Sequence, residues 1–109
     1  MIELFYANTP NGRKISIMLE VIQYPYKVTL VDLKNGDQFK PKFRAISPFS
    51  KIPVITDHDN NISIFESGAI LIYLAEKSGK FYEKKNRFLI NQWLIGQVAY
   101  VGPLLGQHH

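Results

Sequence analysis

A proline directly before a short apolar run, at Ile52-Pro53, restricts how the middle of this 109-residue chain can fold. An X-Pro peptide bond takes the cis form at a cost of only about 0.5–1 kcal/mol, whereas other peptide bonds are almost always trans. We expect Ile52-Pro53 to be cis, which turns the N–H and C=O of Ile52 away from the following strand. These two groups can then pair with the backbone of a small, extended peptide. The alternative interpretation is a trans Pro53 at a sheet edge.

Hydrophobic periodicity and turn residues predict elements in the order βαβαββα. Apolar residues recur at helical spacing after Thr9, a candidate N-cap, and Pro10, which suits the first helical position. The turn composition of residues 57–61 predicts a hairpin. The predicted segments are a strand over Ile2–Tyr6, a helix over Arg13–Gln23, a strand over Tyr26–Leu33, a short irregular helix over Gln38–Ile46, strands over Pro53–Thr56 and Ile62–Phe65, and a helix over Ser67–Lys77 ended by Gly79.

This order is that of a thioredoxin-like α/β domain with a mixed four-stranded sheet, which we assign to residues 1–80. The first two strands flank a helix, so they should be parallel with a right-handed crossover, and the hairpin adds the antiparallel half. A further helix, predicted from about Glu83 to Val101, is apolar enough to need a partner surface. We interpret residues 81–109 as the first helix of a truncated all-helical domain, covered by a missing downstream domain or by a dimer partner.

Composition excludes several kinds of chemistry. The sequence has no cysteine, which removes disulfides, Cys-type zinc sites and every mechanism based on a protein thiol. Any redox chemistry must therefore borrow its sulfur from a ligand. The net charge of +4 comes from scattered Lys and Arg, which indicates a solvated surface and no nucleic-acid partner.

No apolar run reaches the roughly 18–20 residues that a bilayer crossing needs, so no membrane partner is expected. The residues Met1–Leu4 lack the basic region of a secretory signal. These two observations predict a cytoplasmic protein.

Polar side chains stand at the starts of the first and last helices of residues 1–80. Thr9 and Asn11 follow the first strand, where their plain interpretation is capping of the first helix. Glu66 and Ser67 open the last helix, where free N–H groups and the positive end of the helix dipole favour a carboxylate ligand. The alternative for this second pair is an ordinary helix start.

With these residues in view, the chain resembles the amino-terminal domain of the cytosolic glutathione transferases over essentially all of its length. Within that family it is most similar to the Nu-class disulfide-bond oxidoreductases and the related nitrogen-regulating prion protein. The segments that carry the resemblance are Thr9-Pro10-Asn11-Gly12, Ser47-Pro48 through Ile55, Phe65-Glu66-Ser67-Gly68-Ala69-Ile70 with Tyr73-Leu74-Ala75-Glu76, and Gly102-Pro103-Leu104-Leu105-Gly106-Gln107.

The resemblance implies glutathione as co-substrate and places the sulfur-binding residues after the first strand. Most members of the family have Tyr, Ser or Cys there, whereas this chain has Thr9-Pro10-Asn11. Neither Thr9 nor Asn11 acts as a base near neutral pH, but a hydroxyl and an amide N–H can both donate to a thiolate. The expected catalytic residues are Thr9 and Asn11, which would stabilise the thiolate of glutathione.

The remaining glutathione contacts implied by the resemblance lie around Pro53 and Glu66. Ile52 would pair through its backbone with the cysteinyl residue, Glu66 would meet the α-ammonium, and Ser67 the α-carboxylate. Lys51 and Gln38 are candidates for the glycine carboxylate, although a surface lysine needs no function. The expected binding residues are Gln38, Lys51, Ile52, Pro53, Glu66 and Ser67.

The function expected from these residues is that of a glutathione transferase acting as a glutathione-dependent disulfide-bond reductase or transferase. Its partners would be glutathione, a small disulfide or electrophile, and a second copy of the chain in a homodimer. The alternative is a non-catalytic binding or regulatory module, or an inactive fragment. No metal is expected, because His58 lies in a turn as a solvated side chain and His108 and His109 lack further ligands at suitable spacing.

Overall fold

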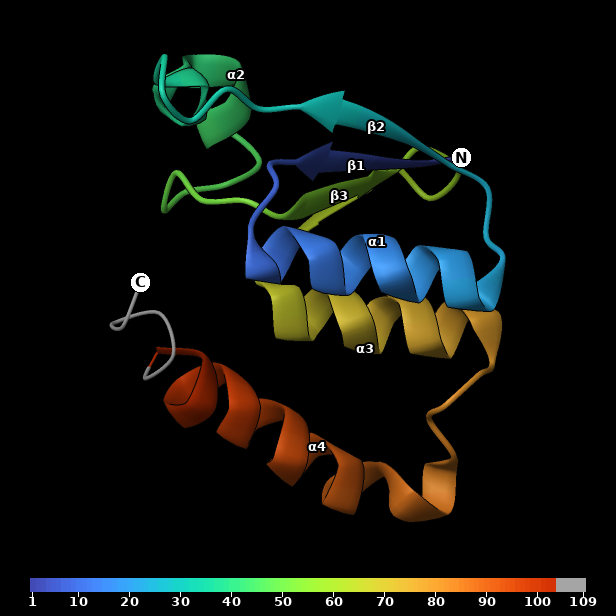
Figure 1. The fold of residues 1–109 in the computed structure, drawn as a ribbon. Coiled ribbons are helices and arrows are strands. Elements are labelled where there is room, and N and C mark those ends of the chain that lie inside the picture. The colour runs from blue at the N-terminus through green and yellow to red at the C-terminus, as the bar shows by residue number, and fades with distance from the viewer. Residues whose placement is uncertain (104–109) are drawn as a thin grey trace.

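The computed structural model describes residues 1–103 (Figure 1). The strands are β1 (Ile2–Tyr6), β2 (Tyr26–Leu30), β3 (Val54–Asp57) and β4 (Ile62–Phe65), and the helices are α1 (Pro10–Ile22), α2 (Pro41–Arg44), α3 (Ser67–Ser78) and α4 (Arg87–Gly96). Short 3₁₀ turns cover Asp37–Phe39 and Lys84–Asn86, and a π-helical turn over Gln97–Val101 continues α4.

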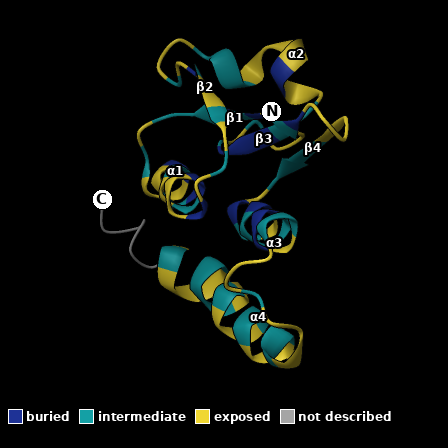
Figure 2. Cartoon of the chain, turned by 90° about the vertical axis from the view of Figure 1, so that its right-hand side faces the viewer, coloured by how far each residue is buried: buried dark blue, intermediate teal, exposed yellow. Residues whose placement is uncertain are grey.

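The strands form one mixed sheet in the order β2-β1-β3-β4. β1 and β2 are parallel, and β3 is antiparallel to both β1 and β4. Helices α1 and α3 lie side by side on one face of the sheet, and α2 lies on the other (Figures 1 and 2). The predicted thioredoxin-like βαβαββα fold is therefore confirmed.

The main core fills the space between the sheet and the α1–α3 pair. Alternate residues of a strand point to one face, so Ile2 and Leu4 of β1 turn toward the helices together. The fully or almost fully buried members of this core are Ile2, Leu4, Ile15, Leu19, Ile22, Ile55, Ile70 and Leu74. A smaller core of Val31, Phe43 and Val54 lies under α2 on the opposite face.

The ends of the helices follow the predicted local chemistry. The Thr9 hydroxyl accepts a hydrogen bond from the Gly12 N–H at 3.1 Å, and Pro10 occupies the first turn of α1. Gly79 ends α3 with a φ of 72°, a conformation that glycine adopts without the steric cost of a Cβ.

Strand β2 is shorter than predicted, because it ends at Leu30 and not at Leu33. The Asp37 N–H donates to the Asp32 carbonyl at 3.1 Å, and the Asp32 N–H donates to the Asp37 carboxylate at 2.9 Å. These bonds curl the chain into a turn before a longer strand can form. Strand β3 also lies one residue later than predicted, at Val54–Asp57, because proline cannot donate to a sheet ladder.

The helix predicted over Glu83–Val101 is divided into the 3₁₀ turn, α4 and the π-helical turn. No residue of α4 is buried, and Phe88 and Trp93 are 85% and 77% exposed. Figure 2 shows α4 below the α1–α3 pair with only intermediate and exposed residues. The apolar face predicted from the sequence is thus present, and it is largely uncovered within residues 1–103.

Candidate functional site

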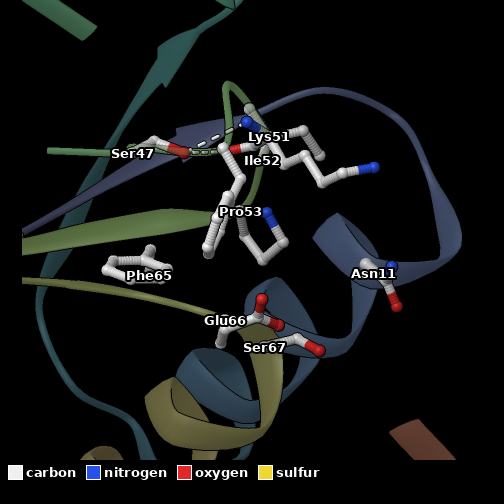
Figure 3. Close-up of a pocket in the computed structure, with 9 residues that line it drawn as sticks. Asn11, Ser47, Lys51, Ile52, Pro53, Phe65, Glu66 and Ser67 are labelled. Atoms are coloured by element: carbon white, nitrogen blue, oxygen red, sulfur yellow. Dashed lines mark hydrogen bonds between the residues drawn. The ribbon is translucent and has the colours of Figure 1, made fainter. Parts of the chain in front are cut away.

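A small pocket of about 60 Å³ lies where the loop before β3 meets the starts of α1 and α3 (Figure 3). The residues that line it are Asn11, Ser47, Phe49, Lys51, Ile52, Pro53, Phe65, Glu66 and Ser67. Predicted site residues from three separate segments, Asn11, Lys51–Pro53 and Glu66-Ser67, meet at this point. Thr9 and Gln38 are not among the lining residues.

The loop before β3 presents main-chain groups to the pocket. The Ile52-Pro53 bond is cis, as predicted. Within residues 1–103, no hydrogen bond engages the N–H or C=O of Ile52. The Ser47 hydroxyl holds the loop in place, since it donates to the Lys51 carbonyl at 2.7 Å and accepts from the Lys51 N–H at 3.1 Å. A fixed loop with an unpaired peptide edge is suited to bind an extended peptide ligand.

Glu66 holds an unusual backbone conformation at the start of α3. Its φ of 74° lies in the left-handed region, which costs a non-glycine residue of the order of 1–3 kcal/mol and tends to occur at functional sites. Its side chain makes no capping bond to the helix. The carboxylate is therefore available to a ligand, and the positive end of α3 beside the buried Ser67 favours an anion.

Asn11 lies in the first turn of α1 with an exposed side chain. Its amide oxygen accepts a hydrogen bond from the Lys14 ammonium at 2.9 Å, so its amide N–H₂ group is left for other partners. Thr9, two residues earlier, uses its hydroxyl as the N-cap and donates to the Ala7 carbonyl over a long 3.4 Å. Both residues thus stand at one helix start, and of the two only Asn11 lines the pocket.

Gln38 occupies the 3₁₀ turn Asp37–Phe39 after β2. Its amide nitrogen donates to the Leu33 carbonyl at 3.4 Å, and its buried amide oxygen has no hydrogen-bond partner among residues 1–103. The structure does not bring Gln38 to the pocket lining. Lys51 does line the pocket and has an exposed side chain.

Two aromatic residues of the pocket were not predicted as site residues. Phe49 and Phe65 pack edge to face, with ring centroids 5.8 Å apart and an interplanar angle of 78°. Phe49 is 66% exposed, which is unusual for so large an apolar ring. The sequence signal for these residues was their position, because Phe49 lies close to Lys51 and Phe65 directly precedes Glu66. Aromatic residues next to a polar motif can form the wall of its pocket.

A buried charge anchors the last turn of α3 to the end of β3, away from the pocket. Burial alone would raise the pKa of Asp57, but hydrogen bonds from Lys77 and Tyr73 outweigh it and lower that pKa to about 2. The hydrogen bond to Asp57 raises the pKa of Lys77 in turn. Asp57 is fully buried, so the network fixes the C-terminal end of the helix that Glu66 precedes.

The described histidine does not form a metal centre. His58 is exposed, but its ring lies 2.8 Å from the Glu3 carboxylate, so the expectation of a purely solvated side chain was incomplete. His108 and His109 lie outside the described residues. Across residues 1–103, no three His, Cys, Asp or Glu side chains gather as a metal ion requires. None of the helices in that range combines the length and apolarity needed to cross a bilayer.

The fold and the pocket together define a thioredoxin-like domain with a small pocket beside a cis-proline. The family model described as "Glutathione S-transferase, N-terminal domain" matches residues 9–77. The chain therefore belongs to the glutathione S-transferase family, which confirms the resemblance seen in the sequence.

Individual relatives agree with this family. Disulfide-bond oxidoreductase YfcG of Escherichia coli is 50% identical over 116 residues, which cover 100% of this chain and 54% of the relative. The transcriptional regulator URE2 of Saccharomyces cerevisiae is 34% identical over 113 residues, which cover 94% of this chain and 31% of the relative.

A similar crystal structure, of a glutathione transferase family member from Pseudomonas fluorescens, contains two bound glutathione molecules. It superimposes with a TM-score of 0.91 and 46% identity, over 97% of this chain and 49% of that one. The chain thus spans about half the length, or less, of the proteins that it matches.

Proposed function

We propose that this chain binds glutathione in the pocket beside Pro53, as the glutathione-binding part of a glutathione-dependent disulfide-bond reductase or transferase. The observation that carries the proposal is the convergence of an unpaired Ile52 peptide edge with the start of α3. Glutathione has an extended peptide backbone and a charged amino-acid end, and the two features match these two groups. The bound glutathione of the Pseudomonas fluorescens relative supports the assignment.

The pocket suggests an orientation for the ligand. In this proposal the cysteinyl residue pairs with the main chain of Ile52, the α-ammonium meets Glu66, and the α-carboxylate meets Ser67 and the N–H groups at the start of α3. Lys51 on the rim takes the glycine carboxylate. We leave Gln38 out of this contact set, because its side chain is directed to Leu33.

Thiolate stabilisation is the chemistry that we assign to Thr9 and Asn11. The Asn11 amide N–H₂ group donates to the sulfur. The Thr9 hydroxyl, which lies outside the pocket lining and donates to the Ala7 carbonyl over 3.4 Å, would supply a second donor by turning from that carbonyl toward the sulfur. A free thiol has a pKa of about 8.5, and lowering it by one unit corresponds to about 1.4 kcal/mol. The site would therefore hold a larger fraction of reactive thiolate at neutral pH.

The proposed reaction is thiol–disulfide exchange, in which the electrons come from glutathione because the chain has no cysteine. The thiolate attacks one sulfur of a small disulfide, forms a mixed disulfide and releases the other sulfur as a thiolate, which takes up a proton. A second glutathione thiolate then attacks the mixed disulfide and yields glutathione disulfide and a second free thiol.

Two measurements test the proposal. Calorimetric titration should show binding of glutathione to the chain, and no binding would overturn the proposed site. Incubation with glutathione and hydroxyethyl disulfide, coupled through glutathione reductase to NADPH oxidation, should show turnover above the rate without protein. A folded chain that binds glutathione but gives no turnover would contradict the enzymatic part.

A non-catalytic binding or regulatory module is the second candidate. It is favoured by the similarity to a transcriptional regulator. It is also favoured by the absence of Tyr, Ser or Cys in the segment directly after β1, which ends at Tyr6. It predicts glutathione binding without turnover, together with capture of a protein partner. The two assays above therefore separate the two candidates.

We also propose that the chain divides near residue 80 and that α4 belongs to a helical region. The exposed apolar side chains of α4 support the proposal that another surface covers this helix. We propose that a second copy of the chain supplies that surface in a homodimer. Light scattering of the purified chain should give twice the monomer mass, and a monomer would contradict the dimer. The family membership and the composition support a cytoplasmic location, which fractionation of cells would test.

A further inference from the structure

The Lys14 ammonium lies between two amide oxygens from distant parts of the chain. It donates to the Asn11 side chain at 2.9 Å and to the Gln97 side chain at 2.8 Å. Lys14 and Asn11 share α1, whereas Gln97 begins the π-helical turn after α4. Single π-helical turns in α-helices occur frequently at functional sites. The three side chains thus connect the helical extension to the proposed sulfur-binding residue.

Lys14 is half-buried and forms no ion pair with an acidic side chain among residues 1–103. The side chain lines a hollow of about 340 Å³ next to the proposed glutathione pocket, and the hollow is bounded by Asn11, Lys14, Glu66, Ser67, Val98, Gly102 and Pro103. Burial lowers the pKa of Lys14. Two neutral amide oxygens are therefore the groups that satisfy this ammonium.

We propose that Lys14 is a positioning residue that orients the Asn11 amide for the sulfur of glutathione, and that Gln97 holds Lys14 in place. The inference rests on the proposed function. A lysine ammonium has three donors and no acceptor, so it can hold an amide only by its oxygen. With the oxygen held, the Asn11 N–H₂ group is presented to the pocket. A flipped amide would present its oxygen to the thiolate, and two acceptors repel each other.

The proposal separates Lys14 from a direct electrostatic role. If Lys14 acts through the Asn11 amide, its removal has no further effect once Asn11 is alanine. If its positive charge stabilises the thiolate directly, the effect persists in the Asn11→Ala background. A double-mutant cycle measures this difference.

The experiment uses the chain and five variants, Lys14→Met, Lys14→Arg, Gln97→Ala, Asn11→Ala and the double variant Asn11→Ala/Lys14→Met. The readout is the pKa of the bound glutathione thiol, from the pH dependence of the ultraviolet absorbance of the thiolate. Binding of S-methylglutathione, which has no ionisable thiol, is measured in parallel, and thermal unfolding confirms that each variant is folded.

We expect Lys14→Met to raise the thiol pKa by about one unit, which is a tenfold loss of thiolate at a pH well below that pKa. Lys14→Arg should retain most of the wild-type pKa, and Lys14→Met should add nothing in the Asn11→Ala background. The affinity for S-methylglutathione should stay within about twofold in Lys14→Met and Lys14→Arg, which is less than about 0.5 kcal/mol. Gln97→Ala should reproduce part of the Lys14→Met effect.

Three outcomes would overturn the inference. An unchanged thiol pKa in Lys14→Met removes the positioning role, and an undiminished effect in the Asn11→Ala background assigns Lys14 a direct charge role instead. Both of these leave the proposed function intact. Failure of the unchanged chain to bind S-methylglutathione overturns the proposed function and this inference together.

Discussion

Helices α3 and α4 are both apolar, yet they differ in what covers them. α3 packs beside α1 on the sheet and buries Ile70, Leu74 and Ala75. α4 buries none of its residues, although it carries Phe88 and Trp93. The apolar content of a helix therefore indicates that it needs a partner surface. The topology decides whether residues 1–103 supply that surface.

The same difference in packing distinguishes the two regions that contribute residues to the proposed site. The pocket residues Ile52, Glu66 and Ser67 stand on segments held by the sheet and its core, where loop and helix start have little freedom. Gln97 lies in the π-helical turn that continues α4, and this helical region makes few other contacts with the rest of residues 1–103. The hydrogen bond from Lys14 to Gln97 is a direct link between the two regions.

The two helices should differ most in stability when one large apolar side chain is truncated in each. Leu74→Ala should lower the free energy of unfolding by about 2–5 kcal/mol, because it leaves a cavity in a closed core. Trp93→Ala, at a side chain that is 77% exposed in the single chain, should change it by less than about 0.5 kcal/mol at protein concentrations at which the proposed homodimer is dissociated. Urea unfolding of both variants measures the difference. Equal losses would show that α4 is covered as well as α3.

Measurements of glutathione binding test whether the packed region forms the ligand site by itself. Glu66→Ala should weaken glutathione binding by about 1.5–3 kcal/mol, the range for a hydrogen bond to a charged group. Glu76→Ala, on the exposed last turns of the same helix, is the matched control and should leave the Kd unchanged. Calorimetric titration measures both, and an equal Kd for Glu66→Ala would refute the placement of the γ-glutamyl end.

Acid should loosen the packed region through Asp57. Its pKa is about 2 in the folded chain and 3.8 ordinarily, so the stabilisation is present above about pH 4 and is lost as the pH falls toward 2. The loss should be about 2 kcal/mol for a fully buried carboxylate. Asp57→Asn should remove this part of the pH dependence, whereas the exposed Asp59→Asn should retain it. Urea unfolding at several pH values between 2 and 6 is the measurement, and an unchanged slope in Asp57→Asn would contradict it.

The smallest expected effect concerns Asn11, the proposed sulfur-binding residue at the boundary between the two regions. Asn11→Ala should lower disulfide reductase activity at least tenfold, about 1.4 kcal/mol, with little change in stability. Asn8→Ala, in the loop directly before α1 and outside the pocket lining, should retain the rate. The hydroxyethyl disulfide assay compares the two variants, and an unchanged rate in Asn11→Ala would remove this residue from the mechanism.

Prediction from the sequence was most accurate where the physics is local. The cap at Thr9, the end of α3 at Gly79 and the hairpin strand Ile62–Phe65 all depend on residues within a few positions of each other. Strand β2 was predicted three residues too long, because its alternation continues to Leu33 while the bonds between Asp32 and Asp37 end it. Those bonds depend on the path of the chain, which alternation does not describe.

The site was predicted only in part for the same reason. Asn11, Ile52 and Glu66 were assigned through the family resemblance, and the structure brings them to one pocket. Thr9 and Gln38 were assigned in the same way, and neither lines that pocket. The aromatic wall of Phe49, in a loop, and Phe65, at the end of β4, was not predicted, because a large apolar residue at such a position has the same local signature whether it faces a pocket or solvent.

Composition and neighbouring residues were enough to predict the element order, the absence of a protein thiol and the position of the cis-proline turn. The contact between Lys14 and Gln97 and the exposed apolar side chains of α4 are visible only in the folded chain. Contacts between residues so far apart depend on how the helices pack on the sheet, and no local pattern specifies that packing.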